Sequence, residues 1–253
     1  MSTEQNKQLV VTATTQLFVE RDVTALDRYF GPTYIQHSPA PDGLQSLRDL
    51  AGALPDDFTY HPARALADGD LVVLHGTYVG FGPEPLVAFD VFRVADGRIV
   101  EHWDALTPVV AETASGRSQT DGPTEVTDPA ATEASRALVS DFAERVLVGA
   151  DYDALTDFIS TQSYAQHNPE AADGLAGFGA AAAAWGAQGK ALAYAKVHQV
   201  VADGEFVFVR SEGEFGVPVA YNDLFRVQDG RIVEHWDVVA PLPAELPHGN
   251  GSF

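Results

Sequence analysis

Cysteine is absent from the 253 residues, and basic residues are scarce, with 15 lysines and arginines against 36 aspartates and glutamates. Without cysteine the chain has no disulfides, iron–sulfur clusters, thiolate metal sites or cysteine nucleophiles. The formal net charge of −21 repels phosphate backbones and anionic membranes. The composition therefore argues against a nucleic-acid partner and against a membrane partner.

Long apolar runs are also lacking, since no stretch approaches the roughly 20 residues that a bilayer span needs. The N-terminal segment MSTEQNKQ is polar and lacks the basic-then-apolar order of a secretory signal. With 45% hydrophobic and 20% charged residues, the composition still suffices for a packed core. We therefore expect a folded cytoplasmic protein.

The most informative feature that is present is an internal repeat. Phe92–Asp104 reads FRVADGRIVEHWD and Phe225–Asp237 reads FRVQDGRIVEHWD, which differ at a single position. Upstream, the segment YIQHSP at Tyr34–Pro39 returns as YAQHNP at Tyr164–Pro169. Both motifs occur in the same order, and the repeat is too long for a solenoid. The sequence therefore predicts two homologous domains in tandem.

The segment between the copies, SGRSQTDGPTEVTD, is rich in Ser, Thr, Gly and Asp and nearly free of apolar residues, as flexible linkers are. We accordingly expect a first domain at residues 1–114, a linker at residues 115–128 and a second domain at residues 129–253. Two homologous domains on one chain are expected to pack as an intramolecular pseudo-dimer.

Each copy begins with helical patterns and ends with strand patterns. In the first copy, apolar spacing predicts helices at 5–21, 24–29 and 44–53. Short β-rich runs then follow, separated by turn signals such as Asp68-Gly69 and Asp96-Gly97. This order predicts an α+β fold in which a curved antiparallel sheet wraps the N-terminal helices and leaves a conical pocket. The predicted strands lie at 59–67, 71–79, 86–94 and 98–106.

The hairpin around Asp96-Gly97 decides which side chains face that pocket. A three-residue turn with Gly97 as a left-handed bulge places Asp90 opposite His102, whereas a two-residue type I′ turn places Asp90 on the other face. We favour the bulged register because it gathers acidic and imidazole groups on one surface. The predicted catalytic set is Asp90, His102 and Asp104 in the first copy, and Asp223, His235 and Asp237 in the second.

Two carboxylates beside an imidazole in an apolar cavity are suited to general acid and base chemistry, because their proton affinities depend strongly on the environment. One carboxylate would remove a proton next to a carbonyl, and the imidazole or the second carboxylate would return one. Two alternatives remain open. Asp90 could bond turn backbone or Arg93 instead, and His102 could be a hydrogen-bonded core residue.

Further polar and aromatic residues are candidates for substrate binding. Gln36 and His37 lie between two predicted helices, where a polar side chain could reach the pocket rim. His37 and its counterpart His167 could instead cap a helix or hold the loop. His75 and its counterpart Arg210 alternate with apolar neighbours on a strand, so each is expected to face inward. The tryptophans suit a core or interface anchor better than a substrate platform. The predicted substrate-binding set is Tyr34, Gln36, His37, His75, Trp103, Tyr164, Gln166, His167, Arg210 and Trp236.

Metal and cofactor signatures are weak. A His-x-Asp pair on a strand with His37 or His75 offers three ligands, but no HExxH or EF-hand spacing occurs. No glycine-rich phosphate loop, nucleophile elbow or dinucleotide fingerprint is present either. We therefore expect neither a metal nor a cofactor.

Taken together, YxQHxP followed by a helix and then DxFRVxDGxIVEHWD resembles the SnoaL-like polyketide cyclase family of the NTF2-like superfamily, once in each half. The resemblance implies cone-shaped α+β barrels and a cofactor-independent intramolecular aldol condensation on an aromatic polyketide ester. It also implies that an acidic residue at the base of the pocket transfers the proton. By position, the six predicted catalytic residues match the pocket-lining motif of the family.

The two copies depart from one another at sites of interest. Ser38 stands where the second copy has Asn168, and the pair of His75 and Arg210 also differs in type. Fused tandems are unusual among relatives, so one pocket could have specialised. The expected function is a cyclase or isomerase acting on a small hydrophobic metabolite in a bacterial secondary pathway. The alternatives are an epoxide hydrolase of the same fold and a non-catalytic small-molecule-binding module.

Overall fold

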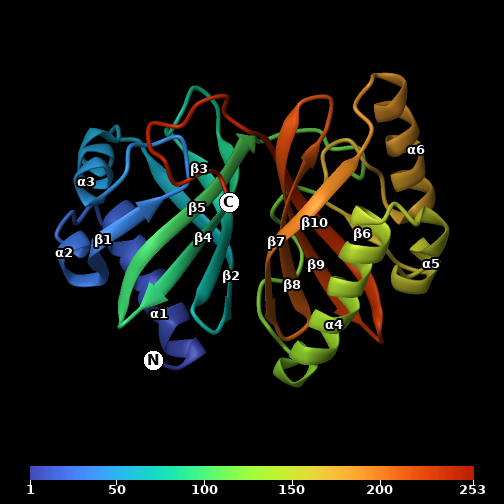
Figure 1. The fold of residues 1–253 in the computed structure, drawn as a ribbon, viewed down its shortest axis with the longest axis horizontal. Coiled ribbons are helices and arrows are strands. Elements are labelled where there is room, and N and C mark those ends of the chain that lie inside the picture. The colour runs from blue at the N-terminus through green and yellow to red at the C-terminus, as the bar shows by residue number, and fades with distance from the viewer. The chain divides into compact units, whose positions relative to one another are not determined.

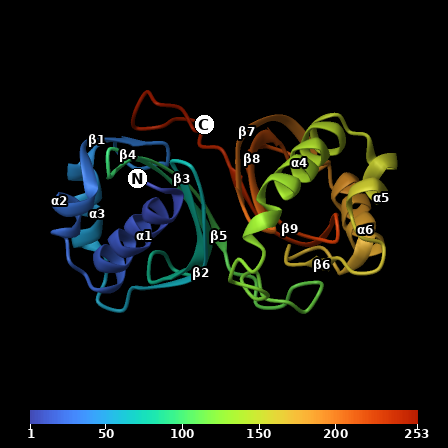
Figure 2. The ribbon, with the colours of Figure 1, turned by 90° about the horizontal axis from the view of Figure 1, so that it is seen from below.

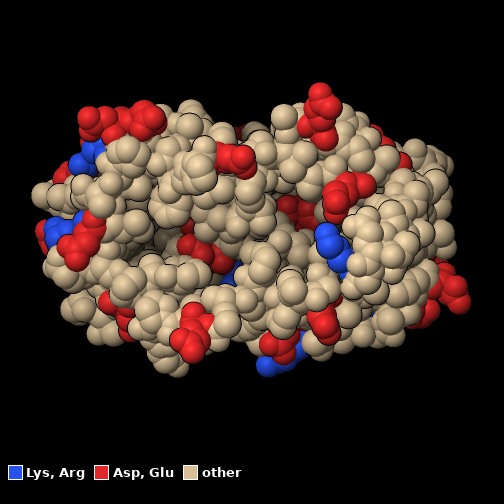
Figure 3. Space-filling view, turned by 90° about the horizontal axis from the view of Figure 1, so that it is seen from above, with Lys and Arg blue, Asp and Glu red and all other residues tan.

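The computed structural model describes residues 1–253 and divides into two compact units. Unit 1 comprises Met1–Val109 together with Pro243–Phe253, and unit 2 comprises Val110–Leu242 (Figure 1). None of the helices combines the length and apolar character needed to cross a bilayer. Acidic side chains are spread over both units on the face in Figure 3, with few basic ones among them, as the net charge of the chain leads one to expect.

The boundaries of these units differ from the domain boundaries predicted at residues 114 and 128. The expected linker packs as part of unit 2, because its polar side chains and backbone find partners there. For example, the backbone N–H and hydroxyl of Thr127 donate to the carboxylate of Glu205 at 2.9 and 2.5 Å. The last eleven residues of the chain, expected in the second domain, belong to unit 1.

The helices of unit 1 form where the apolar spacing predicts them. Helix α1 spans Thr3–Thr14 and continues as a π-helical turn, Thr15–Val19. Ser2 begins α1 with a capping box, since its hydroxyl accepts from the Gln5 N–H and its own N–H donates to the Gln5 side chain. Two further helices follow, α2 at Ala25–Tyr29 and α3 at Leu44–Ala53.

The sheet of unit 1 has five strands in the order β1-β5-β4-β3-β2. The four strands of the predicted meander are present and antiparallel. The added strand β1 was not predicted, and because it runs parallel to β5 the sheet is mixed. The sheet curves without closing into a barrel, and its inner face packs on α1 (Figure 2). The strands are β1 Phe30–Gln36, β2 Thr59–Asp68, β3 Leu71–Val79, β4 Leu86–Ala95 and β5 Arg98–Pro108.

Unit 2 repeats this architecture, which confirms the predicted duplication. Its sheet has the order β6-β10-β9-β8-β7, the same order by position as in unit 1, and β6 runs parallel to β10. The helices are α4 Thr132–Phe142 with a π-helical turn at Ala143–Val148, α5 Leu155–Phe158 and α6 Gly174–Ala187. The strands are β6 Ala165–Gln166, β7 Ala193–Asp203, β8 Phe206–Glu214, β9 Pro218–Gln228 and β10 Arg231–Pro241.

The hairpin between β4 and β5 settles the register that the sequence left open. Asp96 and Gly97 have φ angles of 49° and 72° and form a two-residue turn, because Ala95 pairs with Arg98. The predicted three-residue turn is therefore wrong. A β-bulge further along, where the register shifts between Arg93 and Val94, restores the predicted alternation of faces.

As a result of this bulge, Asp90 pairs with Asp104, and His102 pairs with Phe92 rather than with Asp90. All three predicted catalytic residues of the copy therefore lie on the inner face of the sheet. Unit 2 has the same arrangement, since its register shifts between Ile232 and Glu234.

Candidate active site

Two carboxylates and an imidazole converge on the inner face of each sheet. In unit 1, Asp90 lies on β4, and His102 and Asp104 lie on β5. The atoms with which these three residues could bind an ion all lie within 4.8 Å of one another, and the same holds for the equivalent residues of unit 2. Asp90 is only 4% exposed and His102 only 8%, so both side chains are held away from bulk water. The predicted grouping is therefore present in both copies.

Gln36 fixes the orientation of the His102 ring. Its Oε1 atom accepts hydrogen bonds from the backbone N–H groups of His37 and Ser38 at 3.0 and 3.1 Å, so this end of the amide must be the oxygen. The same oxygen lies 2.9 Å from His102 Nδ1, which must therefore carry a proton. Gln36 thus contacts the predicted catalytic histidine, and its role in substrate binding remains a prediction.

With Nδ1 protonated, the other ring nitrogen of His102 is directed at Asp90. Nε2 lies 3.2 Å from Asp90 Oδ1, within hydrogen-bond distance of the carboxyl. The alternative partner Arg93 is engaged elsewhere, since it donates to Glu101 and Asp70 at 2.7 Å each. Asp90 therefore binds His102 rather than the turn backbone or Arg93.

Two tyrosines that the sequence analysis missed complete the site of unit 1. Tyr78 Oη donates to Asp90 Oδ2 at 2.9 Å, and the Tyr78 ring stacks on Tyr60 with centroids 4.6 Å apart. The Tyr60 hydroxyl is buried and has no hydrogen-bond partner. Burial, reinforced by the Asp90 charge, raises the pKa of both phenols well above the usual range, so both remain donors. The sequence could have revealed Tyr78, because it lies four residues after Leu74 on the same strand and therefore on the same face, and Leu74 pairs with Asp90.

Unit 2 has the same core network. Gln166 Oε1 accepts from the backbone N–H of Asn168 at 3.0 Å and lies 2.9 Å from His235 Nδ1. His235 Nε2 lies 3.0 Å from Asp223 Oδ1, and the hydroxyl of Tyr194 lies 3.2 Å from Asp223 Oδ2. Each copy therefore aligns a glutamine, a histidine, an aspartate and a tyrosine.

The tyrosine pair, however, comes from different strands in the two units. Gly213 stands in unit 2 at the position of Tyr78, and a Cβ there would lie 2.0 Å from the Ala193 carbonyl oxygen. The second ring is instead Tyr221 of β9, which stacks on Tyr194 at 3.9 Å and donates to the Glu214 carbonyl at 2.7 Å. Both phenols of the pair thus have acceptors in unit 2, whereas one phenol in unit 1 has none.

The Asp237 carboxyl has a pKa only slightly below neutral pH. Burial raises its pKa to about 6, the charge of Asp223 adds to this rise, and His235 and a hydrogen bond from Asn168 oppose it. That hydrogen bond runs from Asn168 Nδ2 to Asp237 Oδ2 at 2.7 Å. Burial disfavours the His235 imidazolium, but the bond to Asp223 and the two carboxylate charges outweigh it and raise the pKa of His235. The exchange of Ser38 for Asn168 between the copies thus changes the surroundings of a candidate catalytic acid.

The predicted tyrosines of the repeated motif lie beside these clusters. Tyr34 packs edge-on against Phe30, and its ring lies 6.5 Å from that of His102. Burial and the nearby carboxylates of Asp104 and Asp90 raise the pKa of Tyr34 well above its usual range. Burial and the equivalent acids of unit 2 raise the pKa of Tyr164 in the same way.

His75 and Arg210 do not face the clusters, so the predicted inward orientation is wrong. His75 stacks on Phe89 with centroids 4.2 Å apart, and Phe89 is the neighbour of Asp90 on the same strand. Arg210 donates to Asn222 Oδ1 at 2.8 Å, again one residue from the acid of the cluster. Because successive strand residues point to opposite faces, both side chains lie on the outer face.

The tryptophans and the motif histidines also lie away from the acids. Trp103 follows His102 along β5 and is buried on the outer face, as an anchor of the core would be. His37 stacks on Trp103 with centroids 4.7 Å apart and lies 2.9 Å from Glu101. In unit 2, His167 stacks on Trp236 in the same way, at 4.6 Å. The histidines therefore hold the loop, which was one of the predicted alternatives to a place at the pocket rim.

The clusters also have the donor set of a cation site, with two carboxylates and one imidazole each. Both ring nitrogens of His102 are engaged, by Gln36 and by Asp90, so a cation would replace an existing hydrogen bond. Sites free of metal and cofactor remain a prediction. A shallow surface hollow of about 360 Å³ at the start of α1 is lined by Met1, Ser2, that helix and Tyr29, and contains none of the predicted site residues. The pocket over the acids likewise remains a prediction.

Comparison with known proteins bears on the repeated unit. The sequence profile described as a SnoaL-like domain matches the chain twice, over residues 11–102 and 139–235. No curated protein matches the chain. TsrD from Streptomyces laurentii is a similar solved structure, with 19% identity and a TM-score of 0.37; the match covers 42% of this chain and 90% of that one.

Two further solved structures are similar over comparable lengths. A candidate ketosteroid isomerase from Kribbella flavida is 20% identical, with a TM-score of 0.39, over 49% of this chain and 93% of that one. A candidate polyketide cyclase from Sinorhizobium meliloti is 20% identical, with a TM-score of 0.34, over 38% of this chain and 92% of that one.

Proposed function

The chain belongs to the SnoaL-like domain family, in two copies, and from this premise we propose that it is a cofactor-independent enzyme that moves protons on a small hydrophobic substrate. The observation that carries the proposal is the cluster of two carboxylates and one imidazole in both copies, in which the imidazole lies within hydrogen-bond distance of one carboxylate. Such groups are kept together at the cost of desolvation, which favours a role in proton transfer over one in stability.

The proposed reaction begins with removal of a proton from the carbon next to a carbonyl. Asp104 or Asp237 takes the proton, the C–H bond breaks, and its electron pair forms an enolate. The enolate carbon then attacks a second carbonyl of the same molecule and closes a ring, and the proton returns to the new alkoxide; in an isomerisation it returns to another carbon. A carboxyl with a pKa of about 6, such as that of Asp237, can both take and return a proton near neutral pH.

The developing charge on the substrate oxygen needs a hydrogen-bond donor. We assign this role in unit 1 to Tyr60, whose hydroxyl is buried without an acceptor and whose ring stacks on Tyr78 beside Asp90. Leu54 and Phe58 pack in the same cluster as Tyr60, so the surroundings suit an apolar substrate. Unit 2 offers no equivalent phenol, because Tyr194 and Tyr221 both have acceptors. Unit 1 is therefore proposed to bind the enolate more tightly.

The test uses an aromatic β-keto ester as a probe in D₂O and follows loss of its α-proton signal by NMR. We expect the wild-type protein to accelerate the exchange, and Asp104→Asn combined with Asp237→Asn to abolish the acceleration while circular dichroism stays unchanged. Asp153→Asn, which removes an exposed carboxylate of unit 2, is the matched control.

Binding of the probe without any acceleration by the wild-type protein would contradict the proposal and favour a non-catalytic binding module. Acceleration that survives in the double variant would contradict the assignment of the two acids. Conversion of an aryl epoxide to its diol, with no effect on the keto ester, would favour the epoxide hydrolase alternative.

A further inference from the structure

Two short segments without a place in the repeated motif lie across the loops that carry Gln36 and Gln166. We call residues 113–121 the linker strap and residues 247–251 the C-terminal strap. The linker strap belongs to unit 2 and the C-terminal strap to unit 1. Each strap contacts the loop at the same three groups, although the two straps share no sequence pattern.

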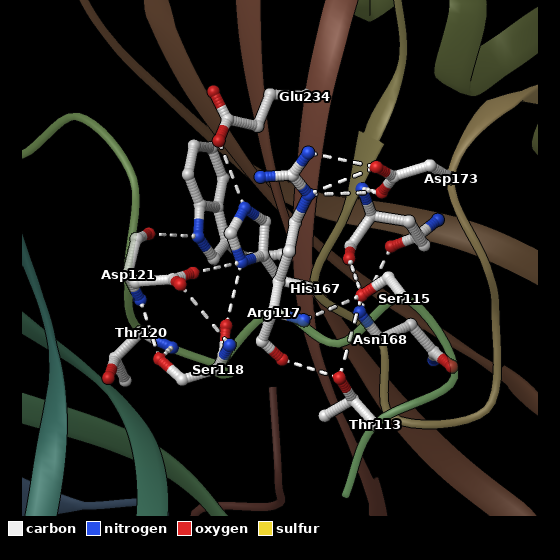
Figure 4. A network of polar contacts seen from close by, with 12 residues as sticks. Thr113, Ser115, Arg117, Ser118, Thr120, Asp121, His167, Asn168, Asp173 and Glu234 are labelled. Carbon is white, nitrogen blue, oxygen red and sulfur yellow. Dashed lines mark hydrogen bonds and ion pairs between the residues drawn. The ribbon is translucent and has the colours of Figure 1, made fainter.

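The first contact of the linker strap is with the backbone of Gln166. Ser115 Oγ donates to the Gln166 carbonyl at 2.7 Å. On the other side of the residue, Asp173 Oδ1 accepts from the Gln166 N–H at 2.9 Å, and Arg117 of the strap holds the Asp173 carboxylate at 2.8 Å (Figure 4). Both backbone groups of this glutamine are therefore fixed, one directly and one through the aspartate.

The C-terminal strap makes equivalent contacts with different residues. Asn250 Nδ2 donates to the Gln36 carbonyl at 3.0 Å, as Ser115 does in unit 2. Asp42 Oδ1 accepts from the Gln36 N–H at 2.9 Å. Hydrogen bonds from Gln36 and Asn250 lower the pKa of Asp42 against the effect of burial, so the carboxylate stays charged and able to accept. His248 of the strap binds the next carbonyl along the loop, that of Ser38, at 2.9 Å.

The third contact is with the histidine that follows the glutamine. His167 Nδ1 lies 2.7 Å from the Ser118 carbonyl and its Nε2 lies 2.9 Å from Glu234, on opposite sides of the ring (Figure 4). His37 Nδ1 lies 2.9 Å from the Gly251 carbonyl. The two equivalent loops are thus fixed at the same groups, each by a strap of different sequence.

We propose that Asn250 and Ser115 are positioning residues, which act on the candidate catalytic histidines through Gln36 and Gln166. The strap fixes the glutamine backbone, the glutamine Oε1 accepts the Nδ1 proton of the histidine, and Nε2 is thereby left facing the aspartate. Loss of the strap contact lets the loop shift, so that its own backbone N–H groups no longer hold the glutamine oxygen in place. The amide can then turn, and its NH₂ end favours the opposite tautomer of the histidine. The catalytic consequence rests on the proposed function, but the effect on the tautomer does not.

The test reads the ring tautomers of His102 and His235 by ¹⁵N NMR in full-length protein, with assignments from His102→Asn and His235→Asn. We expect Asn250→Ala to shift His102 from the Nδ1–H form toward a mixture and to leave His235 unchanged. Ser115→Ala should do the reverse, so each variant is the control for the other. The conservative changes Asn250→Gln and Ser115→Thr keep a donor and should restore the Nδ1–H form.

Activity on the keto ester provides the second readout. A tautomer shift should lower exchange by about tenfold in the unit concerned, with an altered pH profile. Unchanged tautomers in both alanine variants would overturn the proposal, as would equal shifts in both histidines with either variant. If the tautomers shift as expected while no form of the protein accelerates exchange, the positioning role of Asn250 and Ser115 is supported and the proposed function is wrong.

Discussion

Replacement of Asp237 by asparagine tests the electrostatics of the site without a substrate. The carboxyl titrates at 3.8 when unperturbed, and burial raises its pKa to about 6 in the folded protein. Between these values the unfolded chain is ionised while the folded protein still holds the proton. The free energy of unfolding therefore falls as the pH rises through this window. A difference of about two pKa units corresponds to roughly 2 to 3 kcal/mol.

Asp237→Asn removes this ionisation while its amide oxygen can still accept the hydrogen bond from Asn168. The unfolding free energy of the variant, relative to wild type, should therefore grow by roughly 2 to 3 kcal/mol between about pH 3.5 and pH 6.5. Urea unfolding at several pH values measures it, followed by tryptophan fluorescence, since Trp185 and Trp236 both lie in unit 2. The series ends there because His235, whose pKa is raised, titrates at higher pH.

The control is Asp153→Asn, which removes one exposed carboxylate from the same unit. It corrects for the general effect of lowering a large negative charge. A pH-independent difference between Asp237→Asn and wild type would refute the reasoning, since the carboxyl would then titrate alike in both states. A difference that shrinks as the pH rises would show that the pKa is lowered in the fold instead.

Three further predictions follow from single contacts. Asn168→Ala removes a donor to the carboxylate and should raise the Asp237 pKa by about one unit, as ¹³C NMR of the carboxyl would show; a lowered pKa would contradict this. Tyr78→Phe should destabilise the protein by about 1.5 to 3 kcal/mol in urea, whereas Tyr60→Phe should leave stability unchanged or raised, and equal losses would contradict the assigned hydrogen bonds. Gly213→Ala, where the new Cβ would meet a backbone oxygen at 2.0 Å, should cost at least about 2 kcal/mol, and wild-type stability would show that β7 can shift.

The helices and the meander could be predicted from the sequence because their signals are local. Apolar spacing and the Asp-Gly turns place α3, β3 and the hairpin within one or two residues of their observed bounds. Strand β1 was missed because its partner β5 lies far along the chain and runs parallel to it. The straps were missed for a similar reason, since their polar residues are typical of a linker until the loops that they bind are placed beside them.

In the site, the repeated motif identified the acids and the imidazole but not their partners. Tyr78 has Gly213 as its counterpart in the second copy, so comparing the two copies cannot reveal it, although Tyr60 and Tyr194 stand at equivalent positions. His75 was assigned to the wrong face because the alternation of apolar and polar residues does not say which face is inner when both are buried. The register of Asp90 depended on a bulge that the turn sequence does not encode.

Each repeat depends on a strap that follows the other repeat in the sequence, because the C-terminal strap belongs to unit 1 and the linker strap to unit 2. A chain cut after Val109 would leave the N-terminal repeat without His248 and Asn250, and an excised C-terminal repeat that starts at the predicted boundary of residue 129 would lack Ser115 and Arg117. Either half, studied alone, should regain its missing contacts when a synthetic peptide of the other's trailing segment is supplied.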